Sequence, residues 1–414
     1  MQLSDHEKRM LNGEMGEPVR KAMEILVALG ESYDAKRMIE VRNVHLAGAS
    51  IAVTGEAGVK FAENLYCQGG CFCTRTTSNP TALDSARWCE LGISEEDAEL
   101  QGRLTKALEN LGAQITSTCT PYYVGNAPRL GEHVAWGESS AIVYVNSVLG
   151  ARTNREGGPS GLAAALCGRV PECGFHLKEN RYGQLLVNVT IPLRGVTDYG
   201  CLGYYTGTIS SQDTPVFTGI PDTATSDELK ALSAALASSG AVTMFHAVGV
   251  TPEAPDLEAA FGGNKPETVV EFGEQEKKMI LKKLDKEESS NVDWVMLGCP
   301  HASVFELTDI AQTMAGKKIN PDVTMWVGTS FQTKAIADRM GYTDIIEKAG
   351  GKVVCDTCPV LAQTRELAKK MGYRVLTTNS AKMAHYSPGQ FGLKTHYGNI
   401  DKIIDAAVTG RWER

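Results

Sequence analysis

The chain has 414 residues, of which 43% are hydrophobic and 22% are charged, and its formal net charge is −8. This composition is typical of a folded globular protein of two or three domains and excludes a disordered chain. The acidic balance, without clustered Lys and Arg, disfavours nucleic acid as a partner. No apolar run approaches the ~20 residues of a membrane span, and the polar N-terminal segment lacks the apolar stretch of a secretory signal. We therefore expect a cytoplasmic protein that binds neither nucleic acid nor a membrane.

The first part of the chain predicts two amphipathic helices. Residues 17–29 carry apolar side chains at helical spacing, with Pro18 in the first turn and Gly30 after the last. Residues 95–112 follow the same pattern and end at Gly112. Residues 113–123 predict a strand that runs into a loop at Cys119. The apolar run at 141–148 fits a buried strand or a helix, because its periodicity does not decide between them.

The middle of the chain predicts two strands and a charged helix. The strands are expected at residues 186–193 and 241–250, where apolar and β-branched residues are concentrated. The intervening residues 195–225 are dense in Gly, Thr and Ser, which favours loops. Residues 274–288 predict a helix whose charged side faces solvent.

The final third predicts a parallel α/β sheet. Four apolar runs, at residues 292–303, 322–330, 352–360 and 373–382, each end in small polar or thiol residues, and helical patterns separate them. Such alternation is typical of a parallel sheet with right-handed crossovers, in which ligands bind at the carboxyl ends of the strands. We therefore expect an α/β protein in which Cys299, Thr329, Cys358 and Ser380 lie along one edge of this sheet.

Several common catalytic motifs are missing from the sequence. It contains no Walker phosphate loop, no G-x-G-x-x-G after a strand, no H-E-x-x-H and no G-x-S-x-G elbow. Nucleotide-dependent transfer and serine hydrolysis are therefore disfavoured. Eleven cysteines remain as candidates, although many cysteines in such a chain are expected to be small buried hydrophobic residues.

Two local cysteine patterns allow more than one interpretation. Cys355 and Cys358 form a C-x-x-C at a strand end, which suits a reversible thiol pair, a metal site or two buried thiols. Cys67, Cys71 and Cys73 form a C-x3-C-x-C that suits a zinc or cluster site, or a Cys-rich loop without a catalytic role. From these patterns alone, a thiol-redox or zinc-binding protein is a candidate.

A third set of cysteines is dispersed along the chain. Cys119, Cys299 and Cys358 each lie where an apolar run gives way to a loop, and each is followed by proline one or two residues later. Three thiolates that meet at strand ends could hold three corners of a 4Fe–4S cluster. The fourth iron would then be open to act as a Lewis acid on a hydroxylated substrate.

Seven segments together resemble the aconitase X family, and the resemblance extends over nearly the whole chain. They are residues 45–50 (HLAGAS), 74–84, 118–160, 168–181, 297–303 (LGCPHAS), 356–360 (DTCPV) and 379–389. The resemblance implies an aconitase-superfamily-like α/β fold, with several α/β/α subdomains and parallel sheets around a buried iron–sulfur site. Residues 1–235 would form an N-terminal region with the substrate loops and the first cluster cysteine. Residues 236–414 would form a C-terminal region with two further cluster cysteines.

The resemblance also implies roles for particular residues. Cys119, Cys299 and Cys358 would bind the cluster, of the 4Fe–4S or alternatively the 2Fe–2S type, and Cys355 would be a spare thiol. The cysteines at 67–73 depart from the family pattern. Residues similar to the family's substrate-contact motifs are Gly48, Ala49, Ser50, Asn79, Pro80, Ser139, Ser140 and Lys382.

The activity implied by the resemblance is a hydro-lyase that removes water from a small hydroxy acid. Relatives act on (R)-5-phosphomevalonate, giving trans-anhydromevalonate 5-phosphate, or on cis-3-hydroxy-L-proline. The stretch 154–160 and the absence of a fused swivelling domain before Arg414 favour the first substrate. The swivelling domain is then expected as a separate small subunit of a heterodimer. The resemblance implies that this subunit brings a serine as the catalytic base, so no base is predicted in this chain.

Overall fold

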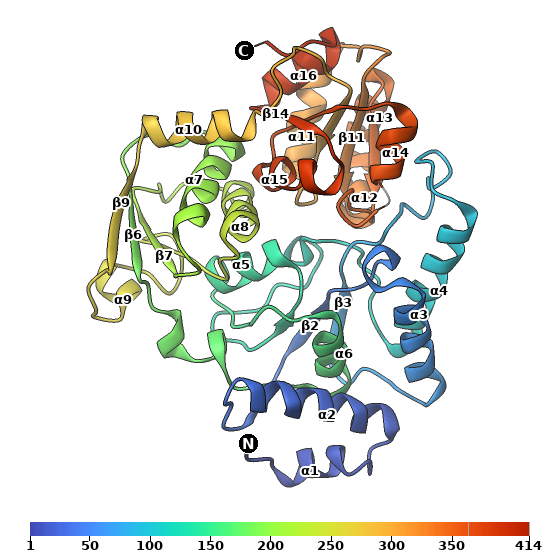
Figure 1. The fold of residues 1–414 in the computed structure, drawn as a ribbon, viewed down its shortest axis with the longest axis vertical. Helices are drawn as coiled ribbons and strands as arrows, with labels where there is room; N and C mark the ends of the chain where they lie inside the picture. The colour runs from blue at the N-terminus through green and yellow to red at the C-terminus, as the bar shows by residue number, and fades with distance from the viewer. Residues whose placement is uncertain (363, 414) are drawn as a thin grey trace.

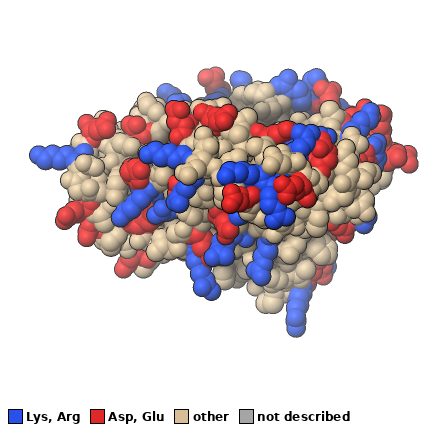
Figure 2. Space-filling model, turned by 90° about the horizontal axis from the view of Figure 1, so that it is seen from below, with Lys and Arg blue, Asp and Glu red and all other residues tan. Residues whose placement is uncertain are grey.

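The computed structural model describes residues 1–362 and 364–413 and contains three lobes that meet near the middle of the molecule. In Figure 1 the blue N-terminal lobe is at the bottom, a green-to-yellow lobe lies at the left, and the orange-to-red C-terminal lobe is at the upper right. In this described part of the chain, no helix is both long enough and apolar enough to cross a bilayer. On the face in Figure 2, positive and negative side chains are interspersed.

The N-terminal lobe is built on a parallel sheet with strand order β3-β2-β4. Its strands are β2 (Asn43–Leu46), β3 (Arg75–Ser78) and β4 (Ala135–Trp136), and a separate antiparallel pair joins β1 (Met38–Glu40) to β5 (Arg169–Pro171). The helices are α1 (Asp5–Leu11), α2 (Glu17–Ser32), α3 (Ile51–Cys67), α4 (Glu95–Leu111) and α6 (Gly158–Cys167). The two predicted helices are confirmed as α2 and α4. Ser94 caps α4 by accepting from the Asp97 N–H, and Gly112 ends it in the left-handed conformation.

The middle lobe contains a parallel sheet with strand order β8-β7-β6-β9. The strands are β6 (Leu185–Val189), β7 (Pro215–Thr218), β8 (His246–Ala247) and β9 (Thr268–Phe272). The helices are α5 (Ser139–Ser147), α7 (Gly195–Ile209), α8 (Ser226–Gly240), α9 (Leu257–Phe261) and α10 (Glu274–Leu284). The run at 141–148, which fitted a strand or a helix, therefore lies almost entirely in helix α5, and the predicted charged helix is confirmed as α10.

The C-terminal lobe confirms the predicted parallel sheet, with strand order β12-β11-β10-β13-β14. The strands are β10 (Trp294–Leu297), β11 (Thr324–Thr329), β12 (Lys352–Cys355), β13 (Val375–Thr378) and β14 (Lys394–Tyr397). The helices are α11 (Val304–Met314), α12 (Phe331–Arg339), α13 (Tyr342–Ala349), α14 (Thr364–Met371), α15 (Ala381–Gln390) and α16 (Ile400–Thr409). Strand β14 was not predicted. Residue 363, in the helical pattern before α14, lies outside the described residues.

Two predictions for the middle of the chain and one for its first part were wrong, and the local structure explains each. Residues 195–225 contain helix α7, whose glycines allow close packing on α8: a Cβ on Gly203 would lie 2.6 Å from a carbonyl oxygen of α8. Residues 241–250 contribute only the two-residue β8. Side chains of α5 take two main-chain hydrogen bonds there, since Ser147 accepts from the Phe245 N–H and Asn146 donates to the Thr243 carbonyl. In the predicted strand 113–123, Gln114 makes one bridge to Thr77 of β3, and the backbone then turns at Ser117, which has a positive φ.

The three lobes pack into one body. The core of the middle lobe includes Ala381 and Tyr397 from the C-terminal lobe, and the Tyr397 hydroxyl donates to the Thr197 carbonyl of α7 at 2.9 Å. The division into regions 1–235 and 236–414 stays a prediction, and its border lies within helix α8.

Candidate active site

Three cysteines from separate parts of the chain line a single cavity of about 160 Å³. Cys299 follows β10, Cys358 follows β12, and Cys119 precedes the short 3-10 helix Pro121–Tyr123. Cys119 is buried, and the other two are partly buried. The remaining lining residues are Pro80, Glu138, Ser139, Gly298, Pro300, His301, Pro359, Val360, Leu361, Lys382 and Tyr386.

His301 joins the three cysteine loops through its hydrogen bonds. Its main-chain N–H donates to Cys119 Sγ at 3.2 Å, and its Nε2 lies 2.9 Å from the Thr357 carbonyl oxygen. Because a carbonyl oxygen only accepts, Nε2 carries the proton, and Nδ1 accepts from the Thr118 hydroxyl at 3.1 Å. Burial lowers the pKa of His301 to about 4, so the ring is neutral at neutral pH. This histidine therefore acts as a neutral link between the loops.

The loop that carries Cys299 has little conformational freedom. Gly298 has φ of +80°, and a Cβ at this position would lie 2.0 Å from the Gly328 carbonyl oxygen. On the other side of the loop, Ser303 and Glu306 form a capping box at the start of α11. The thiol is thus fixed between a glycine turn and a capped helix.

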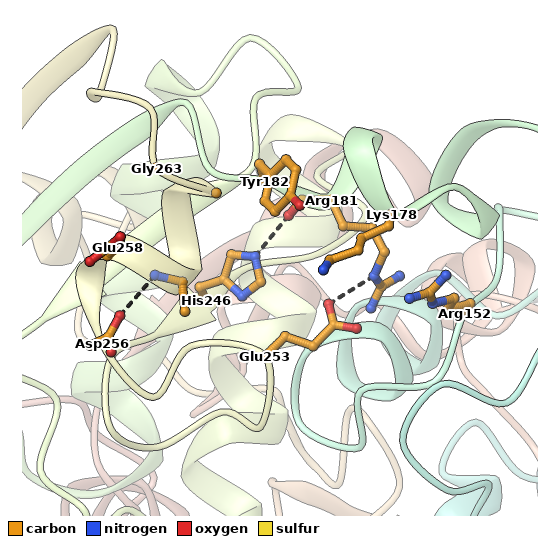
Figure 3. A pocket seen from close by; sticks show the side chains of 11 residues that line it. Arg152, Lys178, Arg181, Tyr182, His246, Glu253, Asp256, Glu258 and Gly263 are labelled. Carbon is orange, nitrogen blue, oxygen red and sulfur yellow. Dashed lines mark hydrogen bonds and ion pairs between the residues drawn. The ribbon is translucent and has the colours of Figure 1, made fainter.

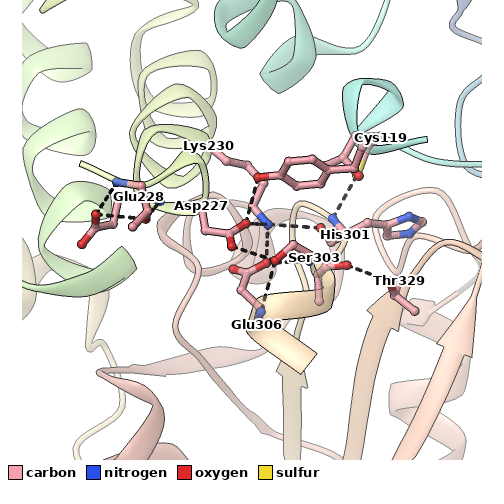
Figure 4. Close-up of polar contacts among 12 residues, drawn as sticks. Cys119, Asp227, Glu228, Lys230, His301, Ser303, Glu306 and Thr329 are labelled. Carbon is pink, nitrogen blue, oxygen red and sulfur yellow. Dashed lines mark hydrogen bonds and ion pairs between the residues drawn. The ribbon is translucent and has the colours of Figure 1, made fainter. Parts of the chain in front are cut away.

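An ionic network around the buried Lys230 lies behind His301 (Figure 4). Lys230 on α8 is ion-paired with Asp227 at 3.0 Å and with Glu306, and it donates to the His301 carbonyl at 3.2 Å. Asp227 also accepts from the Ser303 hydroxyl at 2.7 Å. Because these partners belong to two lobes, the network fixes the Cys299 loop relative to the middle lobe.

The N-terminal lobe holds the loop that carries Cys358. The Ser50 hydroxyl donates to the Leu361 carbonyl at 2.8 Å, and the Thr81 N–H donates to the Asp356 carbonyl at 2.8 Å. Asp84 accepts from the main-chain N–H of Cys355 at 2.8 Å. These contacts cross between lobes, so the position of the Cys358 loop depends on the packing of the whole chain.

The polar wall of the cavity is a buried ion pair between Glu138 and Lys382, whose charged atoms are 2.6 Å apart. Glu138 also accepts from Asn79 Nδ2 at 3.1 Å and from the Ser140 hydroxyl at 3.1 Å. Burial alone would raise the pKa of Glu138, but Lys382 and the hydrogen bonds outweigh burial and lower this pKa to about 2. Burial likewise opposes the charge of Lys382, yet Glu138 raises the pKa of the ammonium above its ordinary value. Both groups are therefore charged at neutral pH.

The structure brings together most, but not all, of the residues predicted to contact substrate. Pro80, Ser139 and Lys382 line the cavity, Asn79 and Ser140 bind Glu138 behind it, and Ser50 supports the Cys358 loop. Gly48 and Ala49 follow β2 and are not among the lining residues.

Two side chains with central positions, Glu138 and His301, were not predicted as site residues. Glu138 directly precedes the serines that begin α5, and an acidic residue at a helix N-terminus was the available signal. The eight histidines of the sequence show no ligand spacing, so no local pattern singled out His301.

The donor chemistry of the cavity fits an iron–sulfur cluster. Among residues 1–362 and 364–413, no three His, Cys, Asp or Glu side chains converge closely enough to hold a single metal ion. In a cluster, however, each thiolate binds a different iron, so its cysteines stand farther apart than the ligands of one ion. The cavity offers three thiols and, among the described residues, no fourth. Cys67, Cys71 and Cys73 are exposed and are not among the residues that line this cavity.

The chain is thus an α/β protein. Its parallel-sheet lobes surround a buried cavity that is lined by three thiols and a lysine. Family models described as the aconitase X first, second and third domains match residues 1–179, 183–282 and 292–409. The chain therefore belongs to the aconitase X family, for which an iron–sulfur cluster is expected.

Relatives and a solved structure agree with this assignment. The chain is 47% identical to the phosphomevalonate dehydratase large subunit of Methanothermobacter thermautotrophicus, covering 96% of each protein. It is 37% identical to the cis-3-hydroxy-L-proline dehydratase of Pseudomonas aeruginosa, covering 99% of this chain and 70% of that protein. The crystal structure of Thermococcus kodakaraensis aconitase X in its holo form superposes with a TM-score of 0.89 at 36% identity, over 98% of this chain and all of that one.

Proposed function

We propose that this chain is the large subunit of an iron–sulfur-dependent hydro-lyase that converts (R)-5-phosphomevalonate to trans-anhydromevalonate 5-phosphate. The observation that carries this proposal is the convergence of Cys119, Cys299 and Cys358 on one cavity that also contains Lys382. Support for the substrate comes from relatives named phosphomevalonate dehydratase large subunit, which match over nearly their full length.

In this proposal the three cysteines bind a 4Fe–4S cluster, with a 2Fe–2S cluster as the alternative. When bound with one iron free of protein ligands, the cluster supplies a Lewis acid for the departing hydroxyl group. A soft thiolate set of this kind suits iron–sulfur chemistry. Cys355 lies at the end of β12 and is not among the lining residues, so it is assigned no ligand role.

The remaining side chains of the cavity bind and orient the substrate. Lys382 holds the carboxylate or the phosphate by charge, and Ser139, which accepts from Lys382 at 3.2 Å, lies beside it in the lining. Glu138 keeps Lys382 charged and fixes its position, so it is a positioning residue. Asn79 donates to Glu138 at 3.1 Å from behind the cavity wall, so it helps to hold this carboxylate in place.

The proton acceptor is expected from a second protein. Glu138 is ionised but already accepts hydrogen bonds from Lys382, Asn79 and Ser140, and His301 uses both ring nitrogens to bind the loops. The relatives named large subunit imply a small-subunit partner. We assign the general base, a serine, to that small subunit, which would complete a heterodimer.

Cluster binding is tested without activity by spectroscopy. The chain is purified anaerobically, reconstituted with iron and sulfide, and examined by iron determination and by absorption near 400 nm. Cys119→Ala, Cys299→Ala and Cys358→Ala are each expected to lose most of the bound iron. Cys355→Ala is the matched control and is expected to retain it, because this thiol does not line the cavity. Equal iron in Cys358→Ala and wild type would refute the ligand assignment.

The substrate is tested with the large and small subunits combined. We expect loss of water from (R)-5-phosphomevalonate, detected by mass spectrometry, and little turnover by the large subunit alone. The alternative, cis-3-hydroxy-L-proline, is supplied in a parallel assay. Preferential turnover of the proline derivative would replace the proposed substrate while leaving the hydro-lyase chemistry intact.

A further inference from the structure

A second cavity, of about 610 Å³, lies beside β8 at the edge of the middle sheet and shares no lining residue with the cysteine cavity. Its walls come from residue 152, segment 178–182, His246 and the segment 253–263 that contains α9. This volume is within the range of small-molecule sites. Figure 3 shows Arg152 and Lys178 on one side, Asp256 and Glu258 on the other, and His246 between them.

Arg181 forms a fixed wall of this cavity and is not free to bind a ligand. Its side chain is 2% exposed, and Nε donates to Glu253 at 2.8 Å. Its two terminal nitrogens donate to four oxygen atoms, which belong to Asn146, Phe175 and Ala151. All five N–H groups are used, so Arg181 holds Glu253 in place at the cavity.

His246 presents an unused acceptor. The residue is 2% exposed, and its Nε2 lies 2.8 Å from the Arg181 carbonyl oxygen, so Nε2 carries the proton. Nδ1 is buried and has no partner within residues 1–362 and 364–413. Burial lowers the pKa of His246, which keeps the ring neutral and leaves a lone pair on Nδ1. A buried acceptor without a donor destabilises the protein, and a bound donor would remove this cost.

Two cations of the same cavity are available to an anion. The Lys178 ammonium points toward His246 and Glu253 in Figure 3, and it has no hydrogen bond or ion pair within the described part of the chain. Arg152 donates through one terminal nitrogen to the His176 carbonyl at 3.2 Å, while its buried Nε has no partner among those residues. The cavity therefore combines unpaired donors for an anion with acceptors, on His246 and Glu253, for a hydroxyl or ammonium group.

We propose that this cavity is a second binding site, for a small organic anion that also carries a hydroxyl or ammonium group. The carboxylate or phosphate of the ligand is held by Lys178 and Arg152, and its hydroxyl or ammonium group donates to His246 Nδ1 and Glu253. The site is separate from the dehydratase reaction, because the two cavities have different linings.

Isothermal titration calorimetry on the reconstituted full chain tests this site. The probes are glycerol 3-phosphate and D-glycerate, which combine an anion with hydroxyls, and inorganic phosphate, acetate and glycerol, which carry one feature each. We expect at least one combined probe to bind more tightly than its fragments. Lys178→Glu should weaken that binding by about tenfold or more, because it reverses a charge at the site. Lys265→Glu is the matched control: it alters an exposed lysine outside the lining and should leave binding unchanged.

Three results would overturn the proposal. One is that no combined probe binds more tightly than the fragments. Another is that Lys178→Glu and Lys265→Glu bind the probe equally well. The last is that binding survives Lys178→Glu but is lost in Lys382→Met, which would place the probe in the cysteine cavity. Circular dichroism checks that each variant is folded. The relative preference for glycerol 3-phosphate or D-glycerate distinguishes a phosphate ligand from a carboxylate.

Discussion

Replacing Glu138 by Gln tests the buried ion pair of the cysteine cavity. The side chains of Lys382 and Glu138 are 10% and 12% exposed, so solvent screens their attraction weakly. Burial opposes the charge of Glu138, yet Lys382 and the hydrogen bonds lower its pKa from 4.5 to about 2. At about 1.4 kcal/mol per pH unit, this difference corresponds to about 3 kcal/mol. Removing one partner of a buried pair has a comparable cost, ~3–5 kcal/mol, because the other charge stays buried without compensation.

A double-mutant cycle measures this interaction through the free energy of unfolding in urea. We expect Glu138→Gln to lose about 3 kcal/mol at pH 7. The double variant Glu138→Gln/Lys382→Met should be less destabilised than the sum of the two single variants, because it leaves no unpaired charge. Glu172→Gln is the matched control. It breaks a more exposed pair with Arg37 and should cost less than ~1 kcal/mol. Strict additivity in the Glu138–Lys382 cycle would refute the reasoning.

Three further predictions concern pH and glycine packing. Since the pKa of Glu138 is lowered in the folded state, its contribution to stability is present above pH 4.5 and is lost as the pH falls toward about 2. Urea unfolding of Glu138→Gln should therefore depend less on pH in that interval, and an unchanged dependence would contradict this. Gly298 has a positive φ, and Gly298→Ala would place a Cβ 2.0 Å from the Gly328 carbonyl oxygen. The substitution should therefore displace Cys299 and reduce the iron content measured after reconstitution. An iron content equal to that of the wild type would contradict this prediction. Gly203→Ala should lower the free energy of unfolding, measured by thermal unfolding, by ~1–3 kcal/mol, because it overpacks α7 against α8. The control Gly102→Ala has open space around the added Cβ and should be neutral or stabilising. Equal effects of the two substitutions would refute the packing argument.

Local sequence patterns predicted the parts of the fold in which neighbouring residues decide the structure. Helices α2 and α4 were recognisable from apolar spacing and from Pro18 and Gly112 at their ends. The C-terminal sheet was predictable because alternating apolar runs and helices favour one topology, which places Cys299 and Cys358 at the same edge.

Patterns of this kind failed where distant residues override local preference. The glycines of α7 indicated loops when read locally, but their small size is what lets α7 pack against α8. The apolar residues before β8 indicated a longer strand, but side chains of α5 take their main-chain hydrogen bonds instead.

The sequence by itself determined the α/β class, the parallel C-terminal sheet and, through resemblance, the family and its candidate cysteines. Only the tertiary structure decided which groups surround those cysteines. Cys119 is held in the cavity by a hydrogen bond from His301, which lies 182 positions further along the chain. Glu138 is held there by Lys382, which lies 244 positions further along. Periodicity encodes contacts between near neighbours in the chain, whereas these contacts arise from the way three lobes pack together.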